Sequence, residues 1–132
     1  MEHYKIQLLQ FLICKEFEPG EQDCYTAELV KSNLHVPSFP YRFDQLYAVT
    51  CWRKDKMFHK EVIEYSTENG QIVKTAPMDI EPVTNSVLFR WHKHAFPVDL
   101  EIKEDSLLHI RVILDWKVHF ESYLMIEKKP GI

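Results

Sequence analysis

The chain has 132 residues, of which 45% are hydrophobic and 13% aromatic, and its formal net charge is −4. This length suffices for a single domain over 1–132 with a full hydrophobic core, and the composition is neither fibrous nor disordered. The small negative charge argues against nucleic-acid binding. No apolar run reaches the roughly 18 residues that a membrane span requires.

Cysteine usage indicates the compartment. Cys14, Cys24 and Cys51 are odd in number, and their spacing matches neither a disulfide framework nor a metal motif. Free cysteines of this kind are typical of a reducing compartment, where they are buried as small apolar side chains. The N-terminus carries no signal-peptide pattern, so we expect a cytoplasmic protein.

The start of the chain predicts two strands, with one alternative left open. Residues 4–17 hold an almost continuous apolar run, which is typical of a strand covered on both faces. The turn-rich residues 18–23 separate it from a second strand at 25–30. The second stretch can instead form a short helix over 26–34, which would make the fold α+β.

The middle of the chain predicts an extended connection and then a pair of strands. Two prolines lie among the aromatic residues of 35–43, and proline pushes the preceding residue into an extended conformation. Residues rich in β-formers follow at 46–52 and at 57–65. These two runs are separated by a charged turn.

A hairpin turn is predicted directly after the second of these strands. Asn69-Gly70 stands between two β-rich runs, which is a strong short-range hairpin signal. The return strand, 71–80, contains Pro77. Proline has no backbone donor, so this strand is expected at the edge of a sheet.

The next predicted strand carries two histidines, and its alternation indicates which face is buried. Val87, Phe89 and Trp91 form the apolar face, which we assign to the core, so that His92 and His94 face solvent. A His-x-His pair on one face can chelate zinc if another histidine or a carboxylate completes the set. The alternative is an ordinary solvated face, because no Cys-x-x-Cys or His-Glu-x-x-His motif supports a metal.

The final hairpin, over 106–127, gives the clearest signal in the chain. Two runs of alternating apolar and polar residues flank a predicted three-residue turn at 115–117. Only one parity of pairing puts both apolar sets on the same face, because a one-residue slip inverts every side chain. The predicted pairs are Leu114 with Val118, Val112 with Phe120, Arg111 with Glu121, His109 with Tyr123, and Leu108 with Leu124.

Many short strands with frequent turns predict an all-β fold. We expect an antiparallel, immunoglobulin-like β-sandwich of about seven or eight strands, with the α+β fold as the alternative. The predicted core residues lie on the apolar faces of these strands: Leu8, Phe11, Val49, Val87, Phe89, Ile110, Val112, Phe120 and Leu124. Trp52 and Trp91 also lie in strand alternations and are expected in the core.

Four segments in this order carry a family resemblance. They are FLIC at 11–14, FPYRFDQLYAV at 39–49, HKEVIEYSTENGQIV at 59–73 and HIRVILDWKVHFESYLMIE at 109–127. Their order resembles that of small, uncharacterised bacterial β-sandwich proteins of unknown function. The resemblance implies a sandwich fold and no site residues. The chain departs from the pattern in its weakly marked second strand and its scarcity of glycine.

The sequence predicts no catalytic residues. The serines lack a Gly-x-Ser-x-Gly elbow, and three glycines cannot build the usual phosphate-binding loop. Trp116, at the predicted turn tip, is either an interface anchor or a cap that folds back on the sandwich. Arg111 and Tyr123, on the polar face of the same hairpin, join it as candidate binding residues.

Three functions remain open at this point. The first is a non-enzymatic binding or assembly module that contacts another protein or a second copy of itself. The second is a metal-binding protein or small metal-dependent enzyme that uses His92 and His94, with zinc as the candidate metal. The third is a binder of a small ligand or carbohydrate. None of the three involves nucleic acid or a membrane.

Overall fold

The structure is a computed structural model that describes residues 5–22, 24–84 and 87–130. These residues form strands and no helix, which confirms the all-β prediction. In this part of the chain no helix has the length and apolar character that a membrane crossing requires. The described strands are β1 (Gln7–Pro19), β2 (Tyr25–Val30), β3 (Asn33–Val36), β4 (Tyr41–Arg42), β5 (Tyr47–Arg53), β6 (His59–Ser66), β7 (Ile72–Lys74), β8 (Met78–Ile80), β9 (Phe89–Ala95), β10 (Glu101–Ile102), β11 (Ser106–Leu114) and β12 (Lys117–Lys128).

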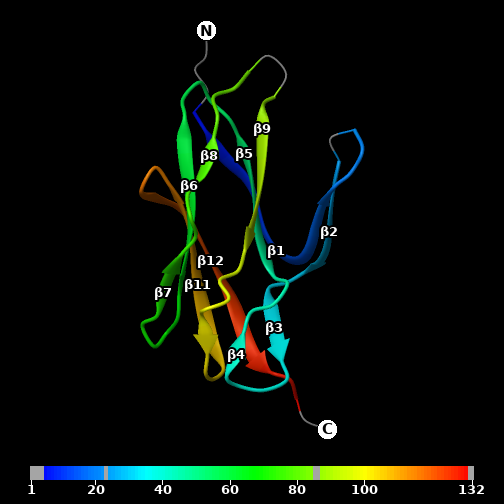
Figure 1. Cartoon of the computed structure of the whole chain (residues 1–132), viewed down its shortest axis with the longest axis vertical. Coiled ribbons are helices and arrows are strands. Elements are labelled where there is room, and N and C mark those ends of the chain that lie inside the picture. The colour runs from blue at the N-terminus through cyan, green and yellow to red at the C-terminus, as the bar shows by residue number, and fades with distance from the viewer. Residues whose placement is uncertain (1–4, 23, 85–86, 131–132) are drawn as a thin grey trace.

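Two large sheets make up the fold (Figure 1). The first has four strands in the order β2-β1-β5-β9. The second follows the order β3-β12-β11-β6-β7, and β8 also pairs with β6. Neighbouring strands run antiparallel except β3, which runs parallel to β12. A separate short pair, β4 and β10, lies near the end of the molecule where the chain terminates.

The main core lies between the two sheets. Its members alternate along strands of both layers, as expected when each sheet buries one face. The strand at 25–30 and the next at 33–36 occupy the stretch where a helix was the alternative. Side chains that bridge the layers include Ala48 and Trp52 from β5, Ile63 and Tyr65 from β6, Ile110 and Val112 from β11, and Leu124 and Ile126 from β12.

The strands number more than the seven or eight expected, because turns divide the chain into several very short pieces. The return strand after Gly70 illustrates this. Gly70 has a φ of 94°, as a hairpin turn requires. The return splits into β7 and β8 around Pro77, and both pieces pair with β6 at the edge of the second sheet.

The final hairpin has the predicted register along most of its length. A bulge then interrupts it, because β12 has one extra residue, His119, opposite the step from Val112 to Ile113. Leu114 therefore pairs with Lys117, and the predicted pairing with Val118 is wrong. The four confirmed pairs are Leu108 with Leu124, His109 with Tyr123, Arg111 with Glu121, and Val112 with Phe120.

The turn of this hairpin has two residues, not the predicted three. Asp115 and Trp116 connect β11 to β12, and their φ angles are 50° and 70°. Positive φ at both central residues defines the type I′ turn, whose twist matches that of the flanking strands. The predicted turn had one residue more than the observed turn, and in the structure the extra residue of this hairpin is His119 in the bulge.

The predicted face of β9 is wrong. His92 and His94 are buried on the side of the main core, whereas Val87 and Phe89 are 42% and 49% exposed. Trp91 lies on the opposite face of the sheet from the histidines, where its ring stacks on Phe17 at a centroid distance of 5.4 Å. Apolar side chains on one face of an edge strand therefore do not identify the buried face here.

A second, smaller apolar cluster explains this inversion. It covers the outer face of the first sheet and includes Cys14, Phe17 and Val49, with Trp91 packed against them. Val49 is thus buried as predicted, but outside the main core. Phe120, another predicted core residue, is 40% exposed because it lies at an open side of the sandwich.

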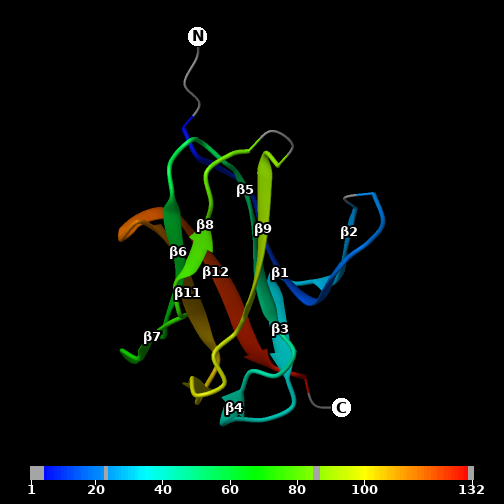
Figure 2. The same ribbon diagram turned by 45° about the horizontal axis from the view of Figure 1, so that its top comes forward.

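This open side is formed by two strand segments that, among the described residues, pair with a strand on one side only. β2 pairs with β1 only from Cys14 onward, and β3 pairs with β12 only from Met125 onward. The free parts, 7–12 of β1 and 117–124 of β12, lie side by side, since the rings of Phe11 and Phe120 are 5.4 Å apart. Figure 2 shows β2 standing off to one side of the layered body.

Candidate functional site

Three buried side chains converge between the sheets. Glu61 comes from β6 in the second sheet, and His92 and His94 come from β9 in the first. Nδ1 of His92 lies 2.6 Å from Oε1 of Glu61, and Nε2 of His94 lies 2.9 Å from the same oxygen. The structure thus brings the two predicted histidines together and adds a carboxylate as the third member of the cluster.

Two further side chains hold the Glu61 carboxylate. The hydroxyl of Thr50 donates to Oε1 at 3.0 Å, and the indole N–H of Trp52 donates to Oε2 at 2.7 Å. Burial alone would raise the pKa of Glu61, but the hydrogen bonds from His92 and His94 outweigh it and lower the pKa to about 2. Glu61 is therefore a buried carboxylate at neutral pH.

A groove at the surface reaches this cluster. It runs between the β7–β8 connection and the end of β9, and its lining includes Thr75, Pro77, Met78 and His94. Nδ1 of His94 is buried without a hydrogen-bond partner among the described residues. The cluster is thus enclosed by the two sheets and approached from the β9 side through His94.

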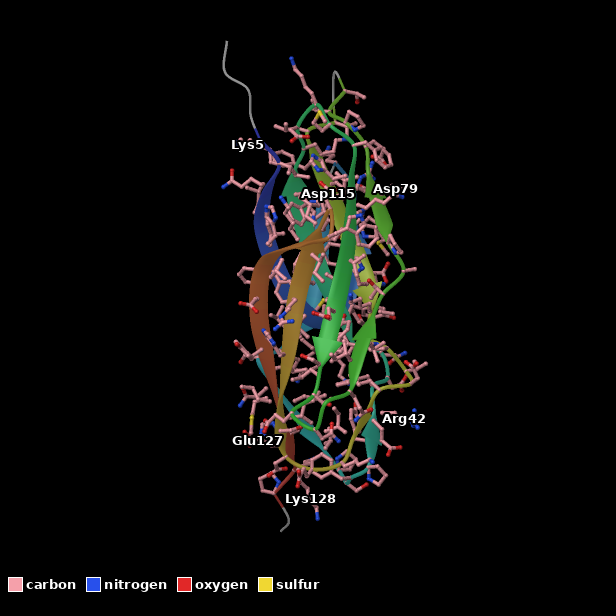
Figure 3. The ribbon with its side chains drawn as sticks, turned by 90° about the vertical axis from the view of Figure 1, so that its left-hand side faces the viewer. Lys5, Arg42, Asp79, Asp115, Glu127 and Lys128 are labelled. Carbon is pink, nitrogen blue, oxygen red and sulfur yellow. The ribbon has the colours of Figure 1, made fainter. Side chains whose placement is uncertain are left out.

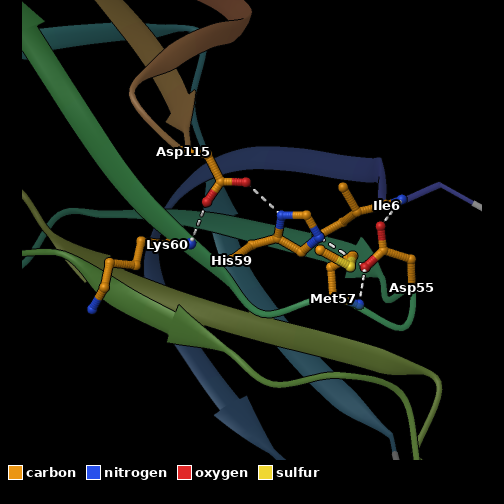
Figure 4. A network of polar contacts seen from close by, with 6 residues as sticks. All are labelled: Ile6, Asp55, Met57, His59, Lys60 and Asp115. Carbon is orange, nitrogen blue, oxygen red and sulfur yellow. Dashed lines mark hydrogen bonds and ion pairs between the residues drawn. The ribbon is translucent and has the colours of Figure 1, made fainter.

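A second histidine network lies at one end of the sandwich (Figure 4). His59, at the start of β6, contacts Asp55 through Nε2 at 2.8 Å and Asp115 through Nδ1 at 2.5 Å. Asp55 also accepts the backbone N–H groups of Ile6 and Met57, and Asp115 accepts that of Lys60. His59 thereby ties the β5–β6 loop, the start of the chain and the final turn together.

These contacts shift the pKa values of all three groups. Burial alone would lower the pKa of His59, but the hydrogen bonds to Asp115 and Asp55 outweigh it and raise the pKa above 6.5. Burial would raise the pKa of Asp55 and of Asp115. Backbone hydrogen bonds and His59 outweigh it and lower both values.

Trp116 lies at the tip of the final turn and is 74% exposed. A side chain this exposed does not fold back to cap the end of the sandwich. Figure 3 looks onto the second sheet and shows Asp115, its neighbour in the turn, at the opposite end of the hairpin from Glu127 and Lys128. Val118, two residues further on, is also exposed.

The other two candidate binding residues lie further along the same hairpin. Tyr123 is half exposed, and its ring stacks on His109 at 4.8 Å and an interplanar angle of 11°. Arg111 contacts Glu64 at 3.2 Å and Glu121 at 3.1 Å. Arg111 is therefore engaged in ion pairs on the sheet surface, while Tyr123 presents a ring face.

The sequence alone did not identify Glu61 or Asp55 as site residues. Glu61 lies in a run that alternates poorly, HKEVIEYS, and a glutamate in a strand normally indicates a solvated position. The only available signal was that Glu61 and the His-x-His pair fall on separate strands that a sandwich can stack face to face.

Comparisons with known proteins assign no family. No protein-family model matches the chain, and no curated protein matches it. The candidate sites are therefore identified from the geometry of this chain alone.

Proposed function

We propose that the protein is a non-enzymatic binding or assembly module that contacts another protein, or a second copy of itself, through the turn and free edge of its final hairpin. The conformation and exposure of Trp116 carry this proposal. The three free cysteines support a reducing compartment, and we assign the module to the cytoplasm.

Trp116 is an unfavourable residue for its position if stability is the only requirement. A positive φ costs a residue with a Cβ atom about 1–2 kcal/mol, and a type I′ turn favours glycine there. Packing of the Trp116 side chain offsets little of this free-energy cost, because Trp116 is 74% exposed. Strain without burial at an exposed aromatic residue is a reason to infer a contact made with another molecule.

The surface beside Trp116 can accept a partner strand. Residues 7–12 of β1 pair only with β5, and residues 117–124 of β12 pair only with β11, so in the described part of the chain the outer side of each segment carries no further strand. Such an edge is a template for β-strand pairing. Exposed apolar side chains lie along it, including Leu9, Val118 and Phe120.

The opposite edge of the second sheet is poorly suited to the same contact. There β7 and β8 are three residues each, and Pro77 stands between them. Short edge strands and proline are devices that block strand addition. The contact is therefore expected on the side of the final hairpin.

The test is the substitution Trp116→Ala. A buried aromatic anchor contributes about 2 kcal/mol or more, so the variant should weaken self-association or partner capture roughly 30-fold or more. Sedimentation over a range of concentrations measures self-association, and quantitative capture measures binding of a partner. The melting temperature should stay nearly unchanged because Trp116 is mostly exposed.

Phe89→Ala is the matched control. Phe89 is also an exposed aromatic residue, but it lies on β9, at the far edge of the first sheet. The control should associate as the wild type does. The proposal fails if the wild-type chain is monomeric and both it and Trp116→Ala capture the same partners equally well.

A further inference from the structure

We propose that Glu61, His92 and His94 form a binding site for a divalent transition-metal ion, with zinc as the probe metal. This inference is independent of the protein contact proposed above, because the cluster lies between the sheets on the side of β9. Two imidazoles and one carboxylate are a donor set that binds zinc and related ions.

The three ligand atoms already point at one place. Nδ1 of His92 and Nε2 of His94 approach the same carboxylate oxygen at 2.6 and 2.9 Å, and the three ligand atoms lie within 4.8 Å of one another. Tetrahedral zinc with bonds of about 2.0–2.2 Å separates its ligand atoms by roughly 3.3–3.6 Å. An ion therefore requires the two histidine nitrogens to move away from Oε1 by roughly 0.4–1 Å, which side-chain rotations can supply.

The charge of the cluster favours a cation. Glu61 is fully buried, and the four side chains that hydrogen-bond its carboxylate are two imidazoles, a hydroxyl and an indole. The hydroxyl and the indole are uncharged donors. Buried charges are normally paired or coordinate a metal, and a divalent ion held by the two imidazoles would lie directly against this carboxylate.

Side chains around the cluster hold the proposed ligands in place by hydrogen bonds, as is usual at metal sites. Ligating carboxylates are themselves hydrogen-bonded, and here Thr50 and Trp52 fix both oxygens of Glu61. Thr50 is the direct cross-strand partner of His92 on β5, so the same ladder positions both. Ligands on paired strands are held more precisely than ligands on loops.

The fold also offers a route to the cluster. The groove between the β7–β8 connection and the end of β9 is lined by His94 and by Thr75, Pro77 and Met78. Three protein ligands leave a fourth position on a tetrahedral ion for water or another small ligand. That position is expected to face this groove.

The experiment is a zinc titration of the untagged, chelator-treated protein, followed by calorimetry. We expect one zinc per chain and a melting temperature that rises with zinc concentration. His92→Ala and His94→Ala should each lose this binding by at least about 100-fold, and Thr50→Ala should weaken it roughly 10–100-fold. His35→Ala, which changes an exposed histidine in an ion pair with Glu127, should bind as the wild type does.

A titration of the wild type with cobalt(II) keeps the test decisive if a variant does not fold. Intense visible absorption bands at one equivalent indicate tetrahedral coordination and support the site. Wild-type protein that takes up neither zinc nor cobalt stoichiometrically overturns the proposal. It is equally overturned if folded His92→Ala and His94→Ala bind zinc as tightly as His35→Ala does.

Discussion

In the described part of the chain, histidines at two places are hydrogen-bonded to carboxylates, and they serve different parts of the structure. His92 and His94 join the two sheets through Glu61, inside the sandwich. His59 instead joins loops at one end through Asp55 and Asp115. The second network is closer to solvent, since the Asp115 side chain is nearly half exposed. Its protonation can therefore follow the pH of the solution.

The raised pKa of His59 predicts a pH-dependent stability. A raised pKa in the folded state stabilises the protein fully below the unfolded value of 6.5, and the contribution is lost as pH rises through the folded pKa. The lowered pKa values of Asp55 and Asp115 act in the opposite direction. Their contribution is present above 3.8 and is lost as pH falls through the folded values. The network is thus most stabilising between about pH 4 and 6.5.

His59→Gln tests this directly. The variant should lose about 1.5–3 kcal/mol of unfolding free energy near pH 6, which is typical for hydrogen bonds to charged groups, and less near pH 9. Urea denaturation at both pH values measures the difference. His35→Ala, at an exposed ion pair, should show little change at either pH. An equal loss from His59→Gln at both pH values would mean that protonation of His59 contributes nothing.

The sequence predicted that His92 and His94 share a strand face, but it could not predict that this face is buried. Alternation along one strand reports two faces and does not say which one meets the other sheet. Trp91 looks like a core residue, yet it packs with Phe17 and Tyr25 on the outside of the first sheet. The buried histidines are tolerated because Glu61, from the facing sheet, accepts a hydrogen bond from each.

The final hairpin shows how one element combines a predictable register with an unpredictable turn. Its register follows from matching apolar faces over Leu108 to Val112, where each residue faces its predicted partner. Near the turn, the matching of apolar faces no longer determines which residues pair. A three-residue turn, or a two-residue turn with a bulge at His119, accommodates the same number of residues. The second solution allows Asp115 to reach His59 and the N–H of Lys60.

The turn geometry predicts that Trp116→Gly stabilises the isolated domain. Glycine removes the cost of positive φ, about 1–2 kcal/mol, and adds back about 0.5–1 kcal/mol of chain entropy. The resulting Asp-Gly pair is also among those that type I′ turns favour. The free energy of unfolding, measured by urea denaturation, should rise by up to about 1 kcal/mol.

Trp116→Ala separates backbone strain from loss of the side chain. Alanine retains the Cβ atom and thus the strain, so its stability should remain close to that of the wild type. A loss of stability in both variants would show that the Trp116 side chain packs more favourably than its exposure indicates.

At the scale of the whole molecule, the two lateral sides of the sandwich differ. On one side, free edges of β1 and β12 lie next to each other beside an apolar groove lined by 6–11, His119 and Phe120. On the other, β7 and β8 cover the edge of β6, and a groove leads to the histidine cluster. The proposed protein contact and the proposed metal site are therefore on opposite sides. Substitutions at one should leave the other intact.

The shared core between these sides is the part that the sequence predicts best. Val112 lies at its centre on β11, fully buried between β6 and β12, and it was predicted there from alternation alone. Val112→Asp places an unpaired charge where neither solvent nor a cation compensates for its lost hydration. The loss of unfolding free energy should exceed about 4 kcal/mol, which is enough to unfold many domains of this size.

Val118→Asp is the matched comparison, because it makes the same change on the same hairpin at a residue that is 52% exposed. This variant should remain folded, with a cooperative thermal transition close to that of the wild type, since an exposed charge stays hydrated. Far-ultraviolet circular dichroism and thermal melts distinguish the two proteins. A soluble Val112→Asp protein that unfolds as cooperatively as Val118→Asp does would contradict the burial of β11 and, with it, the stacking of the two sheets on this strand.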